Sequence, residues 1–402
     1  MSKIKIMAED LANKIAAGEV VESCASVVKE LVENSIDAQS DEITISLVEG
    51  GLKEIKVVDN GTGMDEKDAL LAFSRHATSK LLKEDDLYFI DTLGFRGEAL
   101  PSIAAVSIVN LKTCIKDIGF EVNIEGGKLI SKNKCEARKG TTISIKDLFY
   151  NTPARLKYLK GPKEELALVT TFLEKLALSK PGIKFTLLNN EKNIFKTSGS
   201  GDLLKTIYEI YGLQVSSNMI SVQNSNNDYD LNGYVCKPVV LKSNRNHLIV
   251  FVNGRMIRNN DLNRAINDAY YTYKPVNKFP IVILNINADP TLIDVNIHPT
   301  KQDIKLSKKR DLNDLITNTI KKALYESDLI PEVNYQETTN IAEPNLNVKE
   351  EQVDFNFQEL VNNEIKQPVK EITKIFPVAL VLGTYIICQN EKGIYLIDQH
   401  AA

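Results

Sequence analysis

The sequence predicts an α+β fold, because each of two consecutive units combines segments of helical periodicity with segments of strand periodicity. Apolar residues three or four apart predict helices over 8–22, 26–37, 163–179, 261–272 and 311–326. Alternating apolar residues predict strands near 42–48, 54–59, 106–112, 119–124, 141–146, 230–236, 248–253 and 280–286. The second unit is therefore expected to run from about residue 215 to residue 330.

The composition changes after Ile330. Residues 331–374 are rich in Glu, Asn, Gln and Lys and poor in aromatic residues, which predicts a disordered linker. Apolar residues return at 376–397 and predict one strand, a turn at 391–393 and a second strand. A hairpin this short cannot bury a core alone, so we expect it to begin a further domain.

Composition and charge exclude several classes of protein. The 402 residues are 43% hydrophobic and 25% charged, which is ordinary for a globular protein. The net charge of −4 shows that the chain as a whole is not a polycation that binds nucleic acid. No apolar run approaches the roughly 18–20 residues that span a membrane, and the N-terminus has no signal-peptide core. The five cysteines form no Cys-x-x-Cys pair, which argues against a zinc site or a disulfide scaffold and predicts a reducing cytoplasm.

The helix predicted over 26–37 carries a candidate catalytic pair. Glu30 and Asn34 are four residues apart and therefore share one face of a helix. A carboxylate in this position can polarise a water molecule, and an amide oxygen one turn away can hold Mg²⁺. Two solvated side chains would have the same spacing, so the helix alone leaves both interpretations open.

A glycine turn follows the strand predicted at 54–59. It presents Asp59 to a ligand and lets the backbone approach that ligand closely at Gly61 and Gly63. Asp59 could accept a hydrogen bond from the amino group of adenine, although Asp-Asn-Gly is also a common turn sequence. Residues 140–142 (Gly-Thr-Thr) could close the pocket for the base, or could simply begin a strand.

The stretch 74–100 is long enough to suggest a functional loop or lid. Gly94 and Gly97 flank Phe95 and Arg96, and a predicted helix opens directly afterwards. Backbone N–H groups at such a junction favour an anion such as phosphate, although a plain loop-to-helix junction has the same sequence. Lys301 could reach a γ-phosphate, although a lone surface lysine is usually only solvated.

The motifs occur in the order found in the GHKL ATPase superfamily, which includes gyrase B, Hsp90, histidine kinases and MutL. Longer strings closely resemble the MutL mismatch-repair family over about residues 1–330. These strings are IAAGEV (15–20), GFRGEAL (94–100), LFYNTPAR (148–155), FVNGR (251–255) and the stretch around His298 and Pro299. The last residues, from Asp398 to Ala401, resemble the opening of the endonuclease motif of MutL C-terminal domains. The downstream glutamates of that motif would lie past Ala402, so endonuclease activity stays open.

The resemblance implies a specific architecture. It predicts a Bergerat-type GHKL ATPase α/β sandwich at 1–210 and an α/β domain similar to ribosomal protein S5 domain 2 at 211–330. A disordered linker is then expected at 331–375, followed by the truncated start of a C-terminal dimerisation or endonuclease domain at 376–402.

The resemblance also implies slow, Mg²⁺-dependent ATP hydrolysis, with Glu30 as general base, Asn34 on Mg²⁺, Asp59 on adenine and Lys301 at the γ-phosphate. The complete set of implied nucleotide contacts is Asn34, Ala38, Asp59, Gly63, Met64, Thr78, Ser79, Lys80, Gly94, Arg96, Gly97, Leu100, Thr141 and Thr142.

In this family, ATP orders the lid and drives two N-terminal halves to form a homodimer. The dimer clamps DNA and couples mismatch recognition by MutS to strand incision by downstream repair factors. The candidate DNA-contacting residues are Arg255, Arg258, Arg264, Lys157, Lys160 and Lys163. Contacts of this kind are salt-dependent and independent of base sequence, and scattered solubility charges are the alternative.

Three other functions compete with this one. A topoisomerase or Hsp90-like chaperone is disfavoured by the strings at 94–100 and 149–155. A non-hydrolysing adaptor is disfavoured by the presence of Glu30 and Lys301. A histidine kinase is disfavoured because no histidine lies on a convincing dimerisation helix before the ATP motifs.

Overall fold

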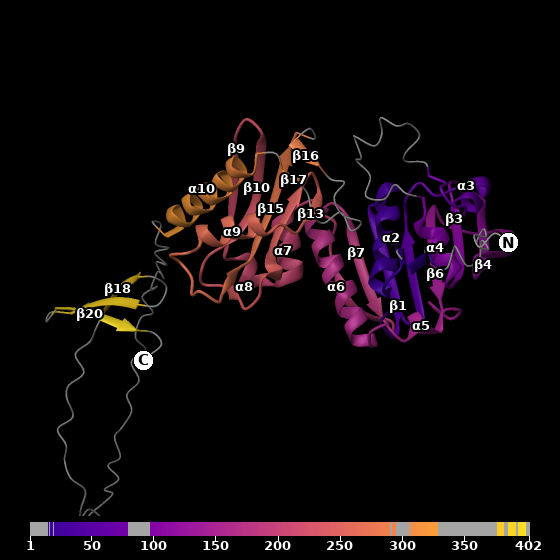
Figure 1. The fold of residues 1–402 in the computed structure, drawn as a ribbon, viewed down its shortest axis with the longest axis horizontal. Helices are drawn as coiled ribbons and strands as arrows, with labels where there is room; N and C mark the ends of the chain where they lie inside the picture. Colours follow the sequence, from indigo (N-terminus) through magenta and orange to yellow (C-terminus); the bar gives the residue numbers. More distant parts are fainter. Residues whose placement is uncertain are drawn as a thin grey trace, which may run out of the picture.

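The computed structural model describes residues 15, 17, 18, 20–78, 97–289, 292–294, 305, 306, 308–328, 376–381, 385–390 and 393–398. These residues form two neighbouring α/β units and a small separate sheet (Figure 1). Within these ranges, none of the helices is both long enough and apolar enough to cross a lipid bilayer.

The first unit contains a mixed eight-stranded sheet in the order β5-β4-β3-β6-β2-β1-β7-β8. Its strands are β1 (Glu42–Val48), β2 (Glu54–Asp59), β3 (Ile108–Cys114), β4 (Gly119–Glu125), β5 (Lys128–Cys135), β6 (Gly140–Lys146), β7 (Lys184–Asn189) and β8 (Lys192–Lys196). β1 runs parallel to β7, and the other neighbouring pairs are antiparallel. The central strands β2 and β6 therefore lie side by side although 80 residues of the chain lie between them.

Helices cover one face of this sheet. They are α2 (Cys24–Asp37), α4 (Ala99–Ala105) and α6 (Pro162–Ser179), and the unit also holds η1 (Glu49–Gly51), α3 (Glu66–Leu71) and α5 (Pro153–Leu156). α2 begins with a reciprocal cap between Ser23 and Ser26, which satisfies backbone N–H groups at the helix start. Its apolar residues at 27, 28, 31 and 32 are fully buried, so helical spacing alone orients α2 against the sheet.

The second unit contains a sheet in the order β13-β12-β15-β10-β9. Its strands are β9 (Met219–Ser225), β10 (Tyr229–Cys236), β12 (Leu248–Val252), β13 (Arg255–Ile257) and β15 (Val282–Ala288). Two short pairs add β11 (Leu241–Lys242) with β14 (Phe279–Pro280), and β16 (Ile293–Asp294) with β17 (Lys305–Leu306). The helices are α7 (Leu203–Tyr211), α8 (Leu213–Ser216), η3 (Arg245–His247), α9 (Asn260–Ala269) and α10 (Lys309–Asp328).

Both faces of the second sheet are buried, which explains the uninterrupted apolar run of β12. Leu248, Val250 and Val252 pack in the cluster that includes α9 and α10. Ile249 and Phe251 point the other way and pack with residues of α7 and α8. Successive strand residues alternate between faces, so every residue of this strand meets a helix layer.

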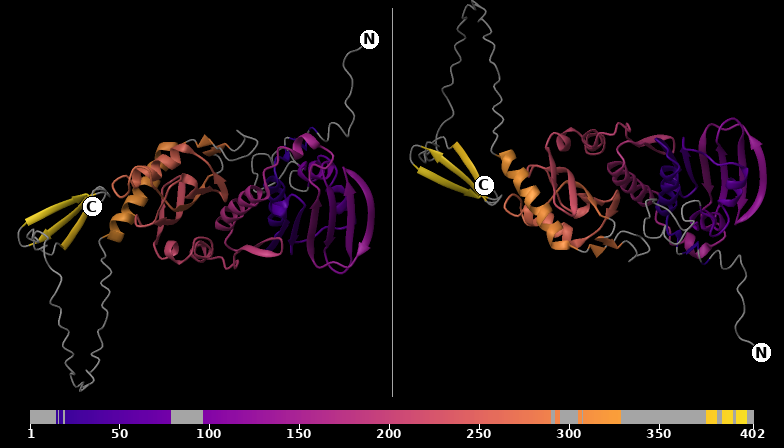
Figure 2. Two further views of the ribbon diagram at one scale, coloured as in Figure 1. Left: turned by 90° about the horizontal axis from the view of Figure 1, so that it is seen from below. Right: turned by 90° about the horizontal axis from the view of Figure 1, so that it is seen from above.

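Helix α6 joins the two units (Figure 2). Val169 and Leu173 belong to the core of the first unit, whereas Leu178 packs in a cluster with Ile249 and Phe251 of the second sheet. At the end of α6, the Ser179 hydroxyl donates a hydrogen bond to the carbonyl oxygen of Gly254 at 2.9 Å. α6 is therefore a rigid element with one end in each unit.

Most predicted elements occur within two residues of their expected bounds, but one prediction is wrong. Residues 376–398 form three antiparallel strands, β18 (Phe376–Val381), β19 (Tyr385–Asn390) and β20 (Gly393–Asp398), rather than a two-stranded hairpin. Val381 and Tyr385 pair across β18 and β19, so the apolar run that resembles one strand contributes to two antiparallel strands. The predicted linker, and most of the helix predicted at 8–22, lie outside the described residues.

Candidate functional site

The candidate catalytic pair, Glu30 and Asn34, lies on the side of α2 that is not packed into the core. Glu30 and Asn34 are half-buried, whereas the neighbouring Leu31 and Ser35 are buried, with Ser35 only 4% exposed. The two polar side chains share one helix face, as their spacing predicts. The carboxylate and the amide are thus held on a rigid helix beside the end of β2.

Asp59, the last residue of β2, is the most highly connected carboxylate of the site. Its Oδ1 atom accepts hydrogen bonds from the backbone N–H of Gly61 at 3.0 Å and of Thr141 at 3.1 Å. Its Oδ2 atom accepts a hydrogen bond from the Ser35 hydroxyl at 2.9 Å. Three donors from α2, the glycine turn and β6 therefore fix the orientation of this carboxylate.

The Ser35 hydroxyl has one hydrogen and two acceptors within reach. Besides Asp59 Oδ2, the carbonyl oxygen of Leu31 lies 3.1 Å from Ser35 Oγ. A hydroxyl donates one hydrogen bond at a time, so a ligand that changes the charge near Asp59 can shift the balance between these acceptors.

The glycines of the turn at 60–63 are required by close backbone packing. A Cβ atom on Gly61 would lie 2.6 Å from Ser40 Oγ and 2.7 Å from the carbonyl oxygen of Ala38. Gly63 has φ +70°, and a Cβ atom there would lie 2.1 Å from the carbonyl oxygen of Cys114. The turn is therefore clamped between the end of α2 and the end of β3.

Thr113 on β3 holds the next part of the turn. Its Oγ1 atom accepts a hydrogen bond from the Met64 N–H at 2.9 Å. The same atom lies 3.2 Å from the carbonyl oxygen of Gly140 and 3.2 Å from Thr141 Oγ1. Thr113 thus connects two of the sequence motifs, the turn that follows Asp59 and residues 140–142. No motif in the sequence indicates Thr113 itself.

Thr141 and Thr142 lie on opposite faces of the sheet. Thr141 pairs with Asp59 in the register of β2 and β6, is 8% exposed and lies on the α2 side. Thr142 pairs with Val58 and Lys112 and points to the face without these helices. The structure therefore brings Thr141, but not Thr142, together with the other predicted nucleotide contacts.

The structure describes the stretch predicted to bind phosphate only at its two ends. Gly97 has φ +63°, and a Cβ atom there would lie 2.5 Å from the carbonyl oxygen of Ala77. The Oε1 atom of Glu98 lies 3.7 Å from a guanidinium nitrogen of Arg75 and 3.5 Å from Nδ1 of His76. Thr78 and Leu100 are half-buried beside this junction. The predicted contacts Ser79, Lys80, Gly94, Arg96 and Lys301 lie outside the described residues.

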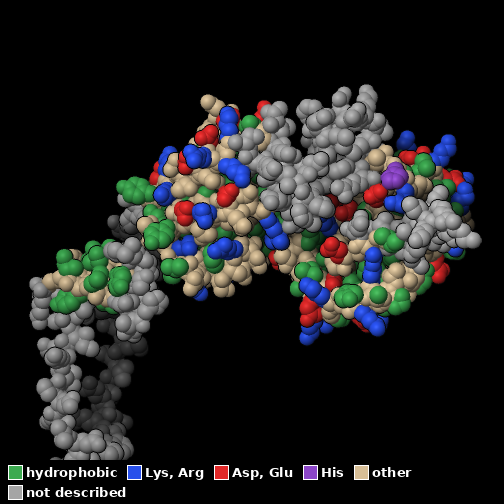
Figure 3. Space-filling model, viewed as in Figure 1, with side chains coloured by type: hydrophobic (Ala, Val, Ile, Leu, Met, Phe, Trp, Pro, Cys, Tyr) green, Lys and Arg blue, Asp and Glu red, His purple; other side chains and the backbone are tan. Residues whose placement is uncertain are grey.

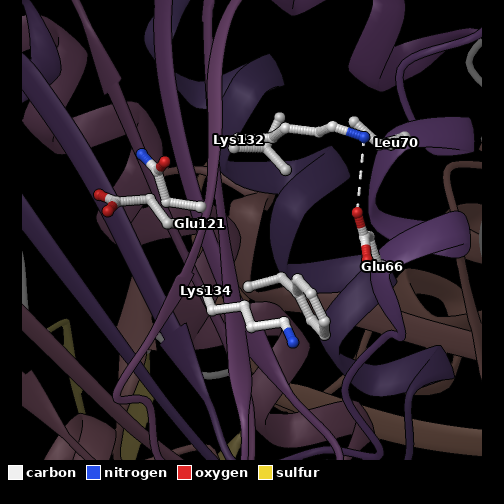
Figure 4. A pocket seen from close by; sticks show the side chains of 8 residues that line it. Glu66, Leu70, Glu121, Lys132 and Lys134 are labelled. Atoms are coloured by element: carbon white, nitrogen blue, oxygen red, sulfur yellow. Dashed lines mark hydrogen bonds and ion pairs between the residues drawn. The ribbon is translucent and has the colours of Figure 1, made fainter.

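A cavity of about 130 Å³ lies elsewhere, between α3 and the β4–β5 edge of the first sheet (Figure 4). It is lined by Glu66, Leu70, Phe120, Glu121, Val122, Lys132, Asn133 and Lys134. Two of the lining residues form an ion pair, with Lys132 Nζ 3.5 Å from Glu66 Oε1. The cavity contains none of the nucleotide motifs, and pockets for drug-sized ligands are larger, at roughly 300–1,000 Å³.

The candidate DNA-contacting residues fall into two groups. Lys157 and Lys160 precede α6, and Lys163 lies in its first turn. Arg258 lies near the other end of α6. There, burial and secondarily the charge of Arg258 lower the pKa of Lys175. The 18 residues of α6 span about 27 Å at 1.5 Å per residue, so one chain does not bring the two groups together. On the face shown in Figure 3, basic side chains lie among acidic and neutral ones.

Two sequence models match the chain. The one described as "Histidine kinase-, DNA gyrase B-, and HSP90-like ATPase" matches residues 21–108, which include α2 and the Asp59 turn. The one described as "DNA mismatch repair protein, C-terminal domain" matches residues 207–325, which cover the second unit.

Close relatives match the whole length of the chain. The DNA mismatch repair protein MutL of Shouchella clausii (strain KSM-K16) is 40% identical over 493 residues, which cover 100% of this chain and 75% of that protein. The DNA mismatch repair protein MutL of Geobacillus sp. (strain WCH70) is 42% identical over 458 residues, with coverages of 100% and 74%.

Solved structures share the fold. The crystal structure of the N-terminal domain of a DNA repair protein superposes with a TM-score of 0.67 at 27% identity, covering 79% of this chain and 99% of that one. The MutL ATPase domain of Aquifex aeolicus, complexed with ADP, superposes with a TM-score of 0.54 at 24% identity, covering 74% and 98%. The fold predicted from the resemblance is therefore confirmed.

Proposed function

The chain belongs to the MutL family of DNA mismatch repair proteins, and we propose that it is an ATP-switched clamp on DNA. It carries an ATPase domain of the GHKL type. In the proposed cycle, ATP binding brings two N-terminal regions together around DNA, and hydrolysis releases them. The clamp couples mismatch recognition by MutS to strand incision by downstream repair factors, and the cytoplasm is the proposed compartment.

The observation that carries the proposal is the orientation of Asp59. A carboxylate has about four lone-pair positions, and three of them are used by Ser35, Gly61 and Thr141. One position therefore remains on Oδ2 to accept a hydrogen bond from the amino group of adenine. A base lacking that amino group would leave the position unpaired, which gives the site a reason to prefer adenine.

The residues present also fit the rest of a nucleotide. Glu30 and Asn34 point from one helix face beside the Asp59 turn, and amide oxygens suit Mg²⁺, which prefers oxygen ligands. When bound, Mg²⁺ would neutralise charge on the phosphate oxygens. Glu30 would orient and deprotonate the attacking water, a role typically worth roughly 10²–10⁴-fold in rate.

The remaining contacts are proposed from the sequence motifs. Thr78, Ser79 and Lys80 are proposed for the lid, and Gly94, Arg96, Gly97 and Leu100 for the phosphates. Lys301, in the second unit, is proposed to reach the γ-phosphate and so to distinguish ATP from ADP. Ala38, Gly63, Met64 and Thr141 would surround the adenine side of the pocket.

The DNA surface is proposed to form from two chains. Within one chain, Arg255 lies on β13, Arg258 in the loop that follows it and Arg264 on α9. Lys157 and Lys160 lie beyond the other end of α6. Dimerisation would double both groups and could line one groove with them. Such a groove would bind phosphates without regard to base sequence and would weaken steeply with salt.

Light scattering tests the switch directly. We expect the chain to dimerise through its N-terminal units with a non-hydrolysable ATP analogue and Mg²⁺, but not with ADP. The measurement compares the mass of the protein alone, with the analogue and with ADP at the same concentration. An unchanged mass with the analogue would contradict the proposed clamp.

A further inference from the structure

Glu165 is a buried carboxylate at the junction of two helices. It lies in the first turn of α6 and is 1% exposed. Its Oε2 atom accepts a hydrogen bond from the backbone N–H of Cys24, the first residue of α2, at 3.0 Å. Its Oε1 atom accepts one from the N–H of Lys160 at 3.3 Å. A side chain 141 residues away thus caps the helix that carries Glu30 and Asn34.

The surroundings of Glu165 are tightly packed. A Cβ atom on Gly50 would lie 2.2 Å from the carbonyl oxygen of Pro162, and one on Gly51 would lie 3.1 Å from Cys24 Cβ. Burial and the nearby Glu165 carboxylate raise the pKa of the Cys24 thiol to about 12, so this thiol stays neutral. The starts of α2 and α6 therefore have little freedom to move relative to each other.

The charge of Glu165 is balanced by backbone dipoles. Among the side chains that the structure describes, no Lys, Arg or His lies within 4 Å of its carboxylate oxygens. A buried carboxylate without a counter-ion needs hydrogen bonds from N–H groups, and a helix N-terminus supplies both donors and partial positive charge. The side chain can satisfy this need only if α2 stays where it is.

We propose that Glu165 is a positioning residue for ATP hydrolysis, which holds α2 so that Glu30 meets the attacking water. The inference rests on the proposed function. Glu30 lies six residues after Cys24, about 9 Å along the helix axis, and a helix transmits a displacement of its start over this distance. A displacement of about 1 Å in a catalytic group can cost roughly 100-fold in rate. The adenine side of the site lies at the other end of α2, where Ser35 and Ala38 would keep their contacts.

The test replaces Glu165 by glutamine in the full chain. Glu165→Gln keeps the size of the side chain, but its amide has one acceptor oxygen, and its NH₂ group would face one of the two N–H donors. We expect kcat for ATP hydrolysis to fall about 10-fold or more, while the Kd for ADP changes less than about twofold. Amide exchange at Cys24 should become faster in the same variant.

Ser26→Ala is the matched control. It removes the Ser26 hydroxyl, which accepts a hydrogen bond from the Ser23 N–H at the same end of α2. The Ser23 hydroxyl still caps the Ser26 N–H, and the contact of Cys24 with Glu165 on α6 is kept, so the variant weakens the helix start without releasing it. We expect its kcat to stay within about twofold of the wild type. A similar loss of kcat in both variants would mean that Glu165 only stabilises the fold.

The outcomes separate the two proposals. A wild-type kcat in Glu165→Gln, or a rise in Kd that matches the loss of kcat, would overturn the role of Glu165 and leave the proposed function standing. A wild-type chain that binds nucleotide without turnover would instead contradict the proposed function, and the positioning role with it. Loss of kcat only in Glu165→Gln, with faster exchange at Cys24, would support the inference.

Discussion

The Ser35 hydroxyl lies 2.9 Å from Asp59 Oδ2, and this hydrogen bond joins helix α2 to the end of strand β2. The two residues belong to two separate sequence motifs, one with the general-base candidate and one with the adenine-binding candidate. The bond therefore fixes the position of the proposed catalytic helix relative to the proposed base pocket. A disturbance at one motif should be measurable at the other.

Ser35→Ala should weaken nucleotide binding and lower the stability of the fold. The substitution frees one lone pair of Asp59 and leaves the partly buried carboxylate less firmly oriented. We expect a loss of about 1 kcal/mol in the free energy of unfolding. We also expect the Kd for ADP to rise several-fold, as measured by calorimetry.

Ser107→Ala is the matched control, because Ser107 is also fully buried and its hydroxyl donates to the Ile103 carbonyl oxygen, away from Asp59. Ser107→Ala should lower the free energy of unfolding by a similar amount and leave the Kd for ADP unchanged. Equal Kd values for Ser35→Ala and the wild type would contradict the proposed coupling of the two motifs.

Gly63→Ala should lower the stability of the fold much more than an ordinary glycine substitution in the left-handed region. Gly63 has φ +70°, and the added Cβ would lie 2.1 Å from the Cys114 carbonyl oxygen. Gly201 has φ +80° but no atom within 4 Å of an added Cβ, so Gly201→Ala reports the backbone cost alone. That cost is about 1–2 kcal/mol, and overpacking at Gly63 should add about 1–3 kcal/mol.

Thermal unfolding of the two glycine variants gives this comparison. The Tm of Gly63→Ala should lie clearly below that of Gly201→Ala. Identical Tm values would mean that the turn can move away from β3 at no cost.

The predicted elements were those whose periodicity is strong over their full length. α2 buries apolar residues three or four apart, and β2 and β6 carry buried apolar residues at alternate positions (Ile55 and Val57, Ile143 and Ile145). Their predicted bounds are close to the observed ones. β5 was missed because most of its side chains are exposed, including the adjacent Leu129 and Ile130, so no alternation marks it. This edge strand is held in its conformation by pairing with β4, and the local sequence of β5 does not indicate that pairing.

The sequence predicts which residues form the candidate site, but not the hydrogen bonds that hold these residues together. The chemistry of Asp59 follows from its turn, but its partners Ser35 and Thr141 are 24 and 82 residues away. The strand register decides that Thr141 faces α2 and that Thr142 faces away, and a shift by one residue would reverse this. The contact of Glu165 with Cys24, on which its proposed role rests, depends on packing between two helices, and no sequence pattern near residue 165 indicates it.

His247 should make the fold less stable in mild acid. Burial, together with Lys242 and Lys175, lowers the pKa of this histidine below its usual value near 6.5, and the ring also meets Tyr211 edge-on. Below pH of about 6.5 the unfolded chain binds a proton that the folded chain resists, so stability falls as the pH falls.

Urea unfolding of His247→Gln and the wild type at pH 7.5 and at pH 5 measures this contribution. The wild type should lose more stability than the variant between the two values. An equal loss in both proteins would contradict the lowered pKa.

Arg258→Ala should weaken DNA binding equally for all sequences. If Arg258 contacts a phosphate, its loss should reduce the slope of log K against log salt by about 1. The measurement is DNA affinity across a salt series with the non-hydrolysable ATP analogue present. Lys132→Ala, on the far edge of the first sheet and paired with Glu66, is the control and should keep the wild-type slope. An unchanged slope in Arg258→Ala would remove this residue from the DNA surface.

The most direct test of the ATPase switch compares Mg²⁺-dependent ATP turnover by the wild type and Glu30→Ala, with nucleotide binding measured separately. Glu30 is half-buried on α2 and takes no part in the network around Asp59. We therefore predict that Glu30→Ala binds ATP like the wild type but loses turnover by about 100-fold or more. Equal loss of binding and turnover, or turnover that survives the substitution, would contradict the assignment of Glu30 as the general base.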